Sequence, residues 1–309
     1  MSEEDKLKNI LILVEQGRRK EASLEILLLE KTLVNKNLRI QLIDAAQSAL
    51  DPIKENETLV RLCSEAIQIS KDFNRFDLRA IFMGRKADFL ESKINFLHYE
   101  QQNLKLSPGW LEFSIEQDRD RYNKVSTKIK KIDDEINSLL EEALRLAGGV
   151  RRKDIMARVL MSAADIDGAR YLYKKSDILR GVLYTKLWLK FRFMRYPFFE
   201  NTFLFSKEKK IELKAMLVSF RSKFLKSAEI FEELNNPMSG YVYFNLANSL
   251  TSAYRFIEAK KYINKASVSA NKFDDNLLKK SIESLLKTIK SRNRDIPDYV
   301  HGETRWDSI

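Results

Sequence analysis

The sequence predicts an all-α protein, and two observations carry that prediction. Apolar residues recur at steps of three and four along almost the whole chain, which is the period of amphipathic helices. Residues that end helices are scarce, with nine glycines and five prolines among 309 residues, and they fall between the periodic segments. Apolar residues make up 44% of the chain and charged residues 32%, a composition typical of a soluble folded protein.

The longest predicted helices flank Ser107-Pro108-Gly109, and together they define a predicted domain at residues 75–149. Their apolar residues alternate steps of four and three, as in a seam between two wound helices. These residues are Met83, Ala87, Leu90, Ile94, Leu97 and Leu104 before the turn, and Leu111, Ile115, Tyr122, Val125, Ile129, Ile132, Ile136, Leu139, Ala143 and Leu146 after it. We expect a long antiparallel helical hairpin, with a second arm of roughly 54 Å and Ala87 opposite Ile129.

Residues 1–74 are expected to form a first domain of four helices. Gly17, the Asn35–Asn37 stretch and Asp51-Pro52 separate these helices, and Asn74 ends the fourth. The chain has one cysteine, Cys63, which excludes an intramolecular disulfide and suits a reducing cytoplasm. The first residues are polar and acidic, unlike a secretory signal peptide.

Residues 150–293 are expected to form a third, helical domain. We place helices at residues 154–164 and 169–174, separated by Asp167-Gly168, then at Ile178–Tyr196 and at Lys207–Leu234. The Ile178–Tyr196 helix is the most apolar, and its apolar residues fall on two opposed faces. That pattern predicts a helix packed between two neighbours and not one lying on a membrane.

Residues 294–309 are expected to form an extended tail, because helical periodicity stops near Lys290 and Pro297 discourages its return. The tail is apolar for a chain terminus and contains Trp306. Two interpretations stay open. The tail docks on the last helices as a cap, or it displays a motif in which Trp306 anchors a partner.

Residues 240–272 resemble a tetratricopeptide repeat, a pair of antiparallel helices that stacks into a solenoid. The matching residues are Tyr243, Leu246, Ala247 and Leu250 in the first helix, and Ala259, Ile263 and Ala266 in the second. Leu250 stands where the family usually has an aromatic residue, and Asn271 stands where proline often ends the repeat. The resemblance implies a tetratricopeptide-like α-solenoid in which several helices, such as those of the hairpin, are overlong, with the C-terminal helical repeats at residues 150–293.

The resemblance also implies a concave groove that binds peptides, with Asn245 and Asn248 facing it. An asparagine amide can hydrogen-bond a carboxylate or an extended backbone, and Lys279 and Lys280 on the next helix would add positive charge. An arginine expected one turn later is absent, so the set departs from the family's carboxylate clamp. The alternative for all four residues is that they are exposed polar side chains without a ligand.

Charge is unevenly distributed along the chain. Residues 1–150 carry 24 Lys or Arg against 26 Asp or Glu, a balance of −2, whereas residues 151–309 carry 31 against 18, a balance of +13. A basic half favours an acidic partner. We therefore expect a scaffold or adaptor that binds an acidic or extended peptide of a partner protein. The alternative is a basic α-solenoid that binds nucleic acid, and homo-oligomerisation is left open.

Sequence motifs for catalysis were sought and none was found. The two histidines, His98 and His301, lie far apart and have no other ligand at metal-binding spacing. Phosphate-binding, dinucleotide-binding and nucleophile-elbow motifs do not occur. The sequence therefore predicts a cytoplasmic protein without catalytic activity, cofactor or metal, and without a membrane span.

Overall fold

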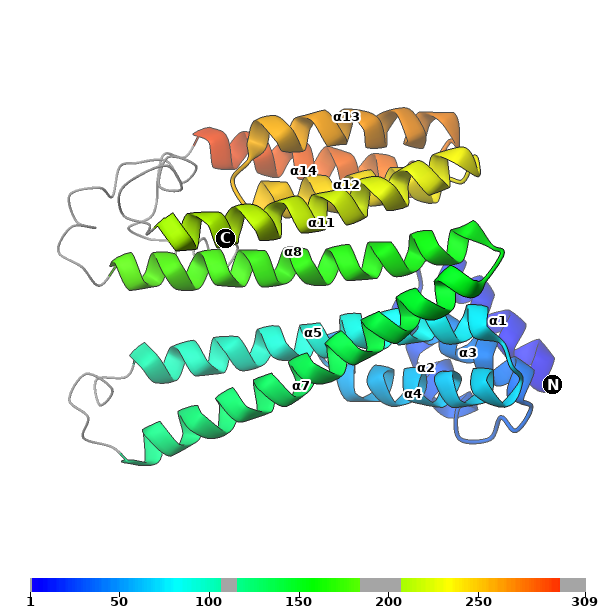
Figure 1. Cartoon of the computed structure of the whole chain (residues 1–309). Helices are drawn as coiled ribbons and strands as arrows, with labels where there is room; N and C mark the ends of the chain where they lie inside the picture. The colour runs from blue at the N-terminus through cyan, green and yellow to red at the C-terminus, as the bar shows by residue number, and fades with distance from the viewer. Residues whose placement is uncertain (1, 107–115, 184–206, 295–309) are drawn as a thin grey trace. The chain divides into compact units, whose positions relative to one another are not determined.

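The computed structural model describes residues 2–106, 116–183 and 207–294, and every regular element in these ranges is an α-helix. The helices are α1 (Glu3–Glu15), α2 (Arg19–Leu29), α3 (Lys36–Ala49), α4 (Asn56–Asp72), α5 (Phe76–Leu106), α7 (Glu116–Gly149), α8 (Lys153–Leu183), α11 (Lys207–Glu233), α12 (Met238–Ser252), α13 (Phe256–Lys272) and α14 (Asn276–Arg294) (Figure 1). The prediction of an all-α protein is confirmed. Contacts divide the chain into two compact units, Met1–Ile155 and Met156–Ile309.

In the first unit, α1 to α4 enclose one apolar core, to which α5 adds Phe82. Arg39 on α3 ties three helices together at the edge of this core. Its guanidinium donates to both carboxylate oxygens of Glu65 on α4, at 2.6 and 2.9 Å, and to the main-chain carbonyl of Glu30 after α2. Only 12% of the Arg39 side chain is exposed, so these bonds are better shielded from water than those of a surface ion pair.

The hairpin arms α5 and α7 pack against each other, as the seam predicts. The seam residues of α5 from Met83 to Leu97 are buried, and so are Val125, Ile132, Ile136, Ala143 and Leu146 of α7. Ile129 and Leu139 are only half-buried. Within the seam, Gln101 donates a hydrogen bond to Ser126, with 2.7 Å between Nε2 and Oγ. The predicted turn at 107–109 lies outside the described residues.

The predicted register of the hairpin is wrong. A register with Ala87 facing Ile129 would bring Lys86 beside Lys130, which places like charges together. In the structure Lys86 pairs with Glu135 instead, at 2.8 Å between Nζ and Oε1. Two further pairs share this register: Arg79 with Glu142 and Arg121 with Glu100. In the observed register, opposite charges therefore face each other along the two arms. The apolar seam alone did not identify this register.

In the second unit, α8 is one continuous helix, so the break predicted at Asp167-Gly168 is wrong. Gly168 lies inside the helix, where a Cβ atom would stand 3.5 Å from Oγ of Ser249 on α12. The glycine therefore lies inside a helix, where a Cβ atom would make only an ordinary contact with α12, and it does not mark the end of a helix. The predicted helix start at Ser176 or Asp177 is also wrong, because α8 continues to Leu183. The two-faced segment beyond Leu183 lies outside the described residues.

Helices α11 to α14 form the core of the second unit with part of α8 (Figure 1). The predicted helix at Lys207–Leu234 is confirmed by α11, with Phe220, Phe224 and Phe231 fully buried. All seven residues that carry the tetratricopeptide resemblance are buried between α11, α12 and α13 and their neighbours. The predicted tail, residues 294–309, lies outside the described residues from 295 onward.

One type of turn joins five pairs of consecutive helices. A residue with positive φ follows each helix: Gly17 (73°), Asn74 (52°), Asn235 (51°), Tyr254 (59°) and Asp274 (50°). The next main-chain N–H then bonds the carbonyl five residues earlier, as Arg75 does to Ser70 and Asp275 does to Ala270. This is the Schellman arrangement at a helix C-terminus. Repeating it brings consecutive helices back against each other in the same way.

Candidate peptide-binding groove

The candidate site lies between α12 and α14, which both pack against α13. The inner stripe of α14 consists of Leu278, Ile282, Leu285 and Ile289, all buried and spaced by four and three residues. Gly240 in the first turn of α12 permits this packing. A Cβ at that position would stand 2.7 Å from Cδ2 of Leu278 and 2.8 Å from Oγ of Ser269. Because no side chain intervenes there, α12 lies close to both α13 and α14.

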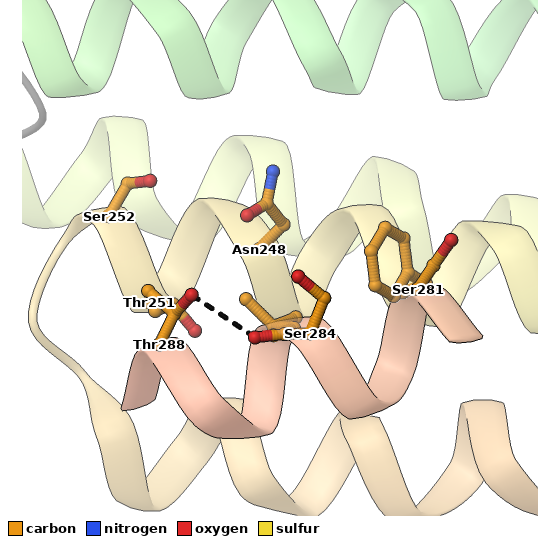
Figure 2. A pocket seen from close by; sticks show the side chains of 8 residues that line it. Asn248, Thr251, Ser252, Ser281, Ser284 and Thr288 are labelled. Atoms are coloured by element: carbon orange, nitrogen blue, oxygen red, sulfur yellow. Dashed lines mark hydrogen bonds between the residues drawn. The ribbon is translucent and has the colours of Figure 1, made fainter. Parts of the chain in front are cut away.

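Beside this packed region the surfaces of α12 and α14 leave an open groove of about 300 Å³ (Figure 2). Its lining residues are uncharged: Phe244, Asn248, Thr251 and Ser252 from α12, and Ser281, Ser284, Leu285 and Thr288 from α14. Two apolar side chains and six polar ones therefore face the same space. A groove of this composition can hold apolar side chains while hydrogen-bonding a main chain.

Three of the hydroxyl groups are already engaged as donors within their own helices. Thr251 donates to the carbonyl of Ala247 at 2.8 Å, and Thr288 donates to that of Ser284 at 3.1 Å (Figure 2). Ser281 bonds its own helix in the same way. Among the described residues, the side chains of Asn248, Ser252 and Ser284 have no hydrogen-bond partner, so these three polar groups are available to a ligand.

The two asparagines singled out from the sequence engage different neighbours. Asn248 is exposed and lines the groove. Asn245 is half-buried, and its Nδ2 donates to Oδ2 of Asp165 on α8 at 3.3 Å. Asn245 therefore connects α12 to α8, and it is not among the residues that line the groove.

The two lysines singled out from the sequence lie near the start of α14 and are not among the lining residues. Lys279 forms an ion pair with Asp274, with 2.6 Å between Nζ and Oδ1, and this contact lowers the pKa of the Asp274 carboxyl. Lys280 is exposed. Of the four predicted residues, the structure brings only Asn248 into the groove.

Lys287 was missed in the sequence analysis. Lys280, Ser284 and Lys287 are spaced by four and three residues, so they share one side of α14. The two exposed lysines flank Ser284 along the helix, one turn before and one turn after it, and neither lines the groove itself. The sequence did contain a signal for the α14 side of the groove. Three hydroxyl residues, Ser281, Ser284 and Thr288, are spaced by three and four residues and therefore form an uncharged strip on one face of the helix.

Tyr241 on α12 lies near Asp275, the residue before α14. Burial and the interaction with Asp275 raise the pKa of the Tyr241 phenol to about 12.

In the part of the chain that the structure describes, no group of three or more His, Cys, Asp or Glu side chains is placed to hold a metal ion. No helix there has the length and apolar character needed to span a membrane. His98 is half-buried on α5, and His301 lies outside the described residues. No protein-family model matches the chain, and neither does any curated protein.

Proposed function

We propose that this protein is a cytoplasmic, tetratricopeptide-like scaffold that binds an extended peptide with acidic residues in the groove between α12 and α14. The observation that carries the proposal is the uncharged groove itself, in which Asn248, Ser252 and Ser284 have no hydrogen-bond partner among the described residues. On α14 the exposed Lys280 and Lys287 lie one turn before and one turn after the lining residue Ser284, and they add positive charge to this part of the surface.

The repeat character of the fold is supported by the shared turn that reverses the chain after α4, α11, α12 and α13. Antiparallel helix pairs joined by identical turns are the building unit of α-solenoids. The small residues Ala247, Ala259 and Ala266 are fully buried between α12 and α13, as close packing of a repeat's two helices requires. On this proposal, alternate helices such as α12 and α14 line one face of the array.

An extended peptide suits the chemistry of the groove better than a nucleic acid does. Its main chain offers N–H and C=O groups that Asn248 can bond as donor and acceptor together. Phe244 and Leu285 provide apolar surface for its side chains. Nucleic acid would require cations along the groove to neutralise phosphates, and none of the eight lining residues is charged.

The test uses the full chain and short fluorescein-labelled peptides, one rich in Asp and Pro and one with Lys in place of Asp. Fluorescence anisotropy should show binding of the acidic peptide only. Asn248→Leu should weaken it about tenfold, since a tenfold loss corresponds to about 1.4 kcal/mol, comparable to one buried hydrogen bond. Asn264→Leu, an exposed asparagine on α13 outside the groove, is the matched control.

A labelled single-stranded oligonucleotide, titrated over about 50 to 200 mM salt, separates the two kinds of partner. Tight oligonucleotide binding that falls steeply with salt and is unchanged by Asn248→Leu would replace the proposal with the nucleic-acid alternative. The proposal would also be contradicted if neither peptide bound, or if Asn248→Leu and Asn264→Leu weakened peptide binding equally.

A further inference from the structure

The residues that follow α14 are opposite in charge to the helices that carry the groove. Residues 295–309, which lie outside the described residues, contain four Asp or Glu and one Lys or Arg, a balance of −3. Residues 238–294, which span α12, α13 and α14, contain 11 Lys or Arg and four Asp or Glu, a balance of +7. Opposite net charge attracts an attached segment to the surface that it leaves.

This segment starts beyond one end of the groove. Thr288 of α14 and Ser252 of α12 line the same end (Figure 2). Helix α14 ends at Arg294, six residues after Thr288, which is about 9 Å farther along the helix. In the opposite direction, the α14 side of the groove extends about 10.5 Å from Thr288 to Ser281. Fifteen extended residues span up to about 50 Å, so residues 295–309 are long enough to turn back and cover the whole groove.

The composition of the segment also suits the groove. Its apolar residues are Ile296, Tyr299, Val300, Trp306 and Ile309. In the groove, Phe244 and Leu285 offer apolar surface to such side chains. Pro297 disfavours a helix, and the N–H and C=O groups of an extended main chain need partners when they leave water. The side chains of Ser252 and Ser284 have no hydrogen-bond partner among the described residues and are available for that role.

We infer that residues 295–309 occupy the groove between α12 and α14 in the free protein, and that a partner peptide must displace them. The short tether gives this segment an effective concentration on the order of millimolar at the groove, which favours it over the same segment of a second copy. The occupation is independent of the proposed function, whereas the control of peptide binding rests on it.

The experiment traps the segment in the groove with a disulfide. In the full chain, Val300→Cys is combined either with Ser284→Cys, in the groove, or with Glu283→Cys, at the exposed neighbouring position that does not line it. Both positions lie about 15 to 17 Å before the end of α14, and six extended residues after Arg294 reach about 20 Å, so residue 300 can approach either one. Cys63 is buried and therefore reacts last.

Disulfide formation is followed in glutathione disulfide by non-reducing gel electrophoresis and by mass spectrometry of the digested protein. Each rate is divided by the rate at which the corresponding variant without Val300→Cys reacts with a small disulfide reagent, so that differences in thiol reactivity cancel.

We expect the Ser284→Cys variant to form the intramolecular disulfide at least about fivefold faster than the Glu283→Cys variant. The oxidised Ser284→Cys protein should not bind the labelled acidic peptide, and reduction should restore binding. Equal rates, or disulfides only between two chains, would overturn the inference, and so would peptide binding that oxidation leaves unchanged. A fast intramolecular disulfide in a protein that binds no peptide when reduced would support the occupied groove and contradict only the proposed function.

Discussion

Gly240→Ala should destabilise the second unit, because the added methyl group has no space. Its Cβ would lie 2.7 Å from Cδ2 of Leu278, 2.8 Å from Oγ of Ser269 and 3.0 Å from Cβ of Ser269. Favourable contacts between carbon atoms lie at about 3.5 to 4.0 Å, so at least two neighbours must move. Leu278 is 1% exposed and Ser269 is 8% exposed, so each would have to move within a packed region.

The expected magnitude follows from two opposing effects. Overpacking of this kind costs about 1 to 3 kcal/mol. Alanine regains at most about 1 kcal/mol of helix propensity relative to glycine, and less in the first turn, where Gly240 lies. The net loss in the free energy of unfolding should therefore be about 1 to 2 kcal/mol. That corresponds to a fall in Tm of about 3 to 6 °C for a unit of this size.

Gly168→Ala is the matched control within the same unit. Its Cβ would lie 3.5 Å from Oγ of Ser249, an ordinary contact, in the middle of α8. This variant should be neutral or stabilising by up to about 1 kcal/mol, because alanine is the better helix former.

Both variants are compared by urea unfolding and by thermal melting, followed by far-ultraviolet circular dichroism. The Gly240→Ala loss should shrink when Leu278→Ala is combined with it, since the shorter side chain removes the nearest contact. If Gly240→Ala raised the Tm as Gly168→Ala does, the close approach of α12 to α13 and α14 would be refuted.

Three further predictions concern the first unit. Ile136→Asp, at a fully buried seam position, should lower the free energy of unfolding by more than about 3 kcal/mol. Ile129→Asp, at a half-buried seam position, should lower it by about 1 to 2 kcal/mol. Equal losses of the two variants in urea unfolding would contradict the seam. Burial raises the pKa of the Cys63 thiol to about 12, so maleimide at pH 8 should label it only after unfolding, and rapid labelling of the native protein would count against its burial. A hydrogen bond from Arg75 lowers the pKa of Asp77, so the native state favours the ionised carboxylate. This contribution is complete above the unfolded pKa of about 4 and is lost as the pH falls through the lowered native pKa. Urea unfolding between about pH 6 and pH 2 should therefore show a smaller acid loss in Asp77→Asn than in the unchanged protein, and identical pH profiles would contradict this assignment.

Apolar periodicity predicted the long helices because burial of one face is what holds a helix in a folded protein. Glycine misled the prediction at residue 168, because Asp167-Gly168 is compatible with both a helix end and a helix interior. In the structure α8 continues through Gly168 to Leu183, held by packing with helices that come later in the chain, which local sequence does not reveal.

The register of the hairpin was not predictable from the seam, since sliding one arm by whole turns keeps apolar residues facing apolar residues. The prediction assumed a tight turn at Ser107–Gly109 and did not weigh the charges beside the seam. Lys86 and Glu135 supply the information that was left unused, because only one of the two registers pairs opposite charges there.

The candidate groove was predictable in part. The resemblance to a tetratricopeptide repeat pointed to the face of α12 that carries Asn248, which the structure places in the groove. It could not show that Asp165 on α8 engages Asn245, or that Asp274 engages Lys279, because both partners depend on how helices and turns meet in space. Lys287 was overlooked because one further lysine on a basic helix looks like a solvated side chain.

One turn geometry recurs between consecutive helices although no single residue type marks it in the sequence. Gly, Asn, Asn, Tyr and Asp occupy its positive-φ position at residues 17, 74, 235, 254 and 274. Glycine and asparagine tolerate this conformation, whereas a tyrosine there is costly and is retained in a buried setting, with Tyr254 6% exposed and packed edge-on to Phe256. The backbone geometry of the turn is thus conserved along the chain while its residue type is not.

Because two such turns separate α12 from α14, the two helices run in the same direction beside α13. That arrangement places Asn248 and Ser284 in one groove, although no repeated motif links them in the sequence.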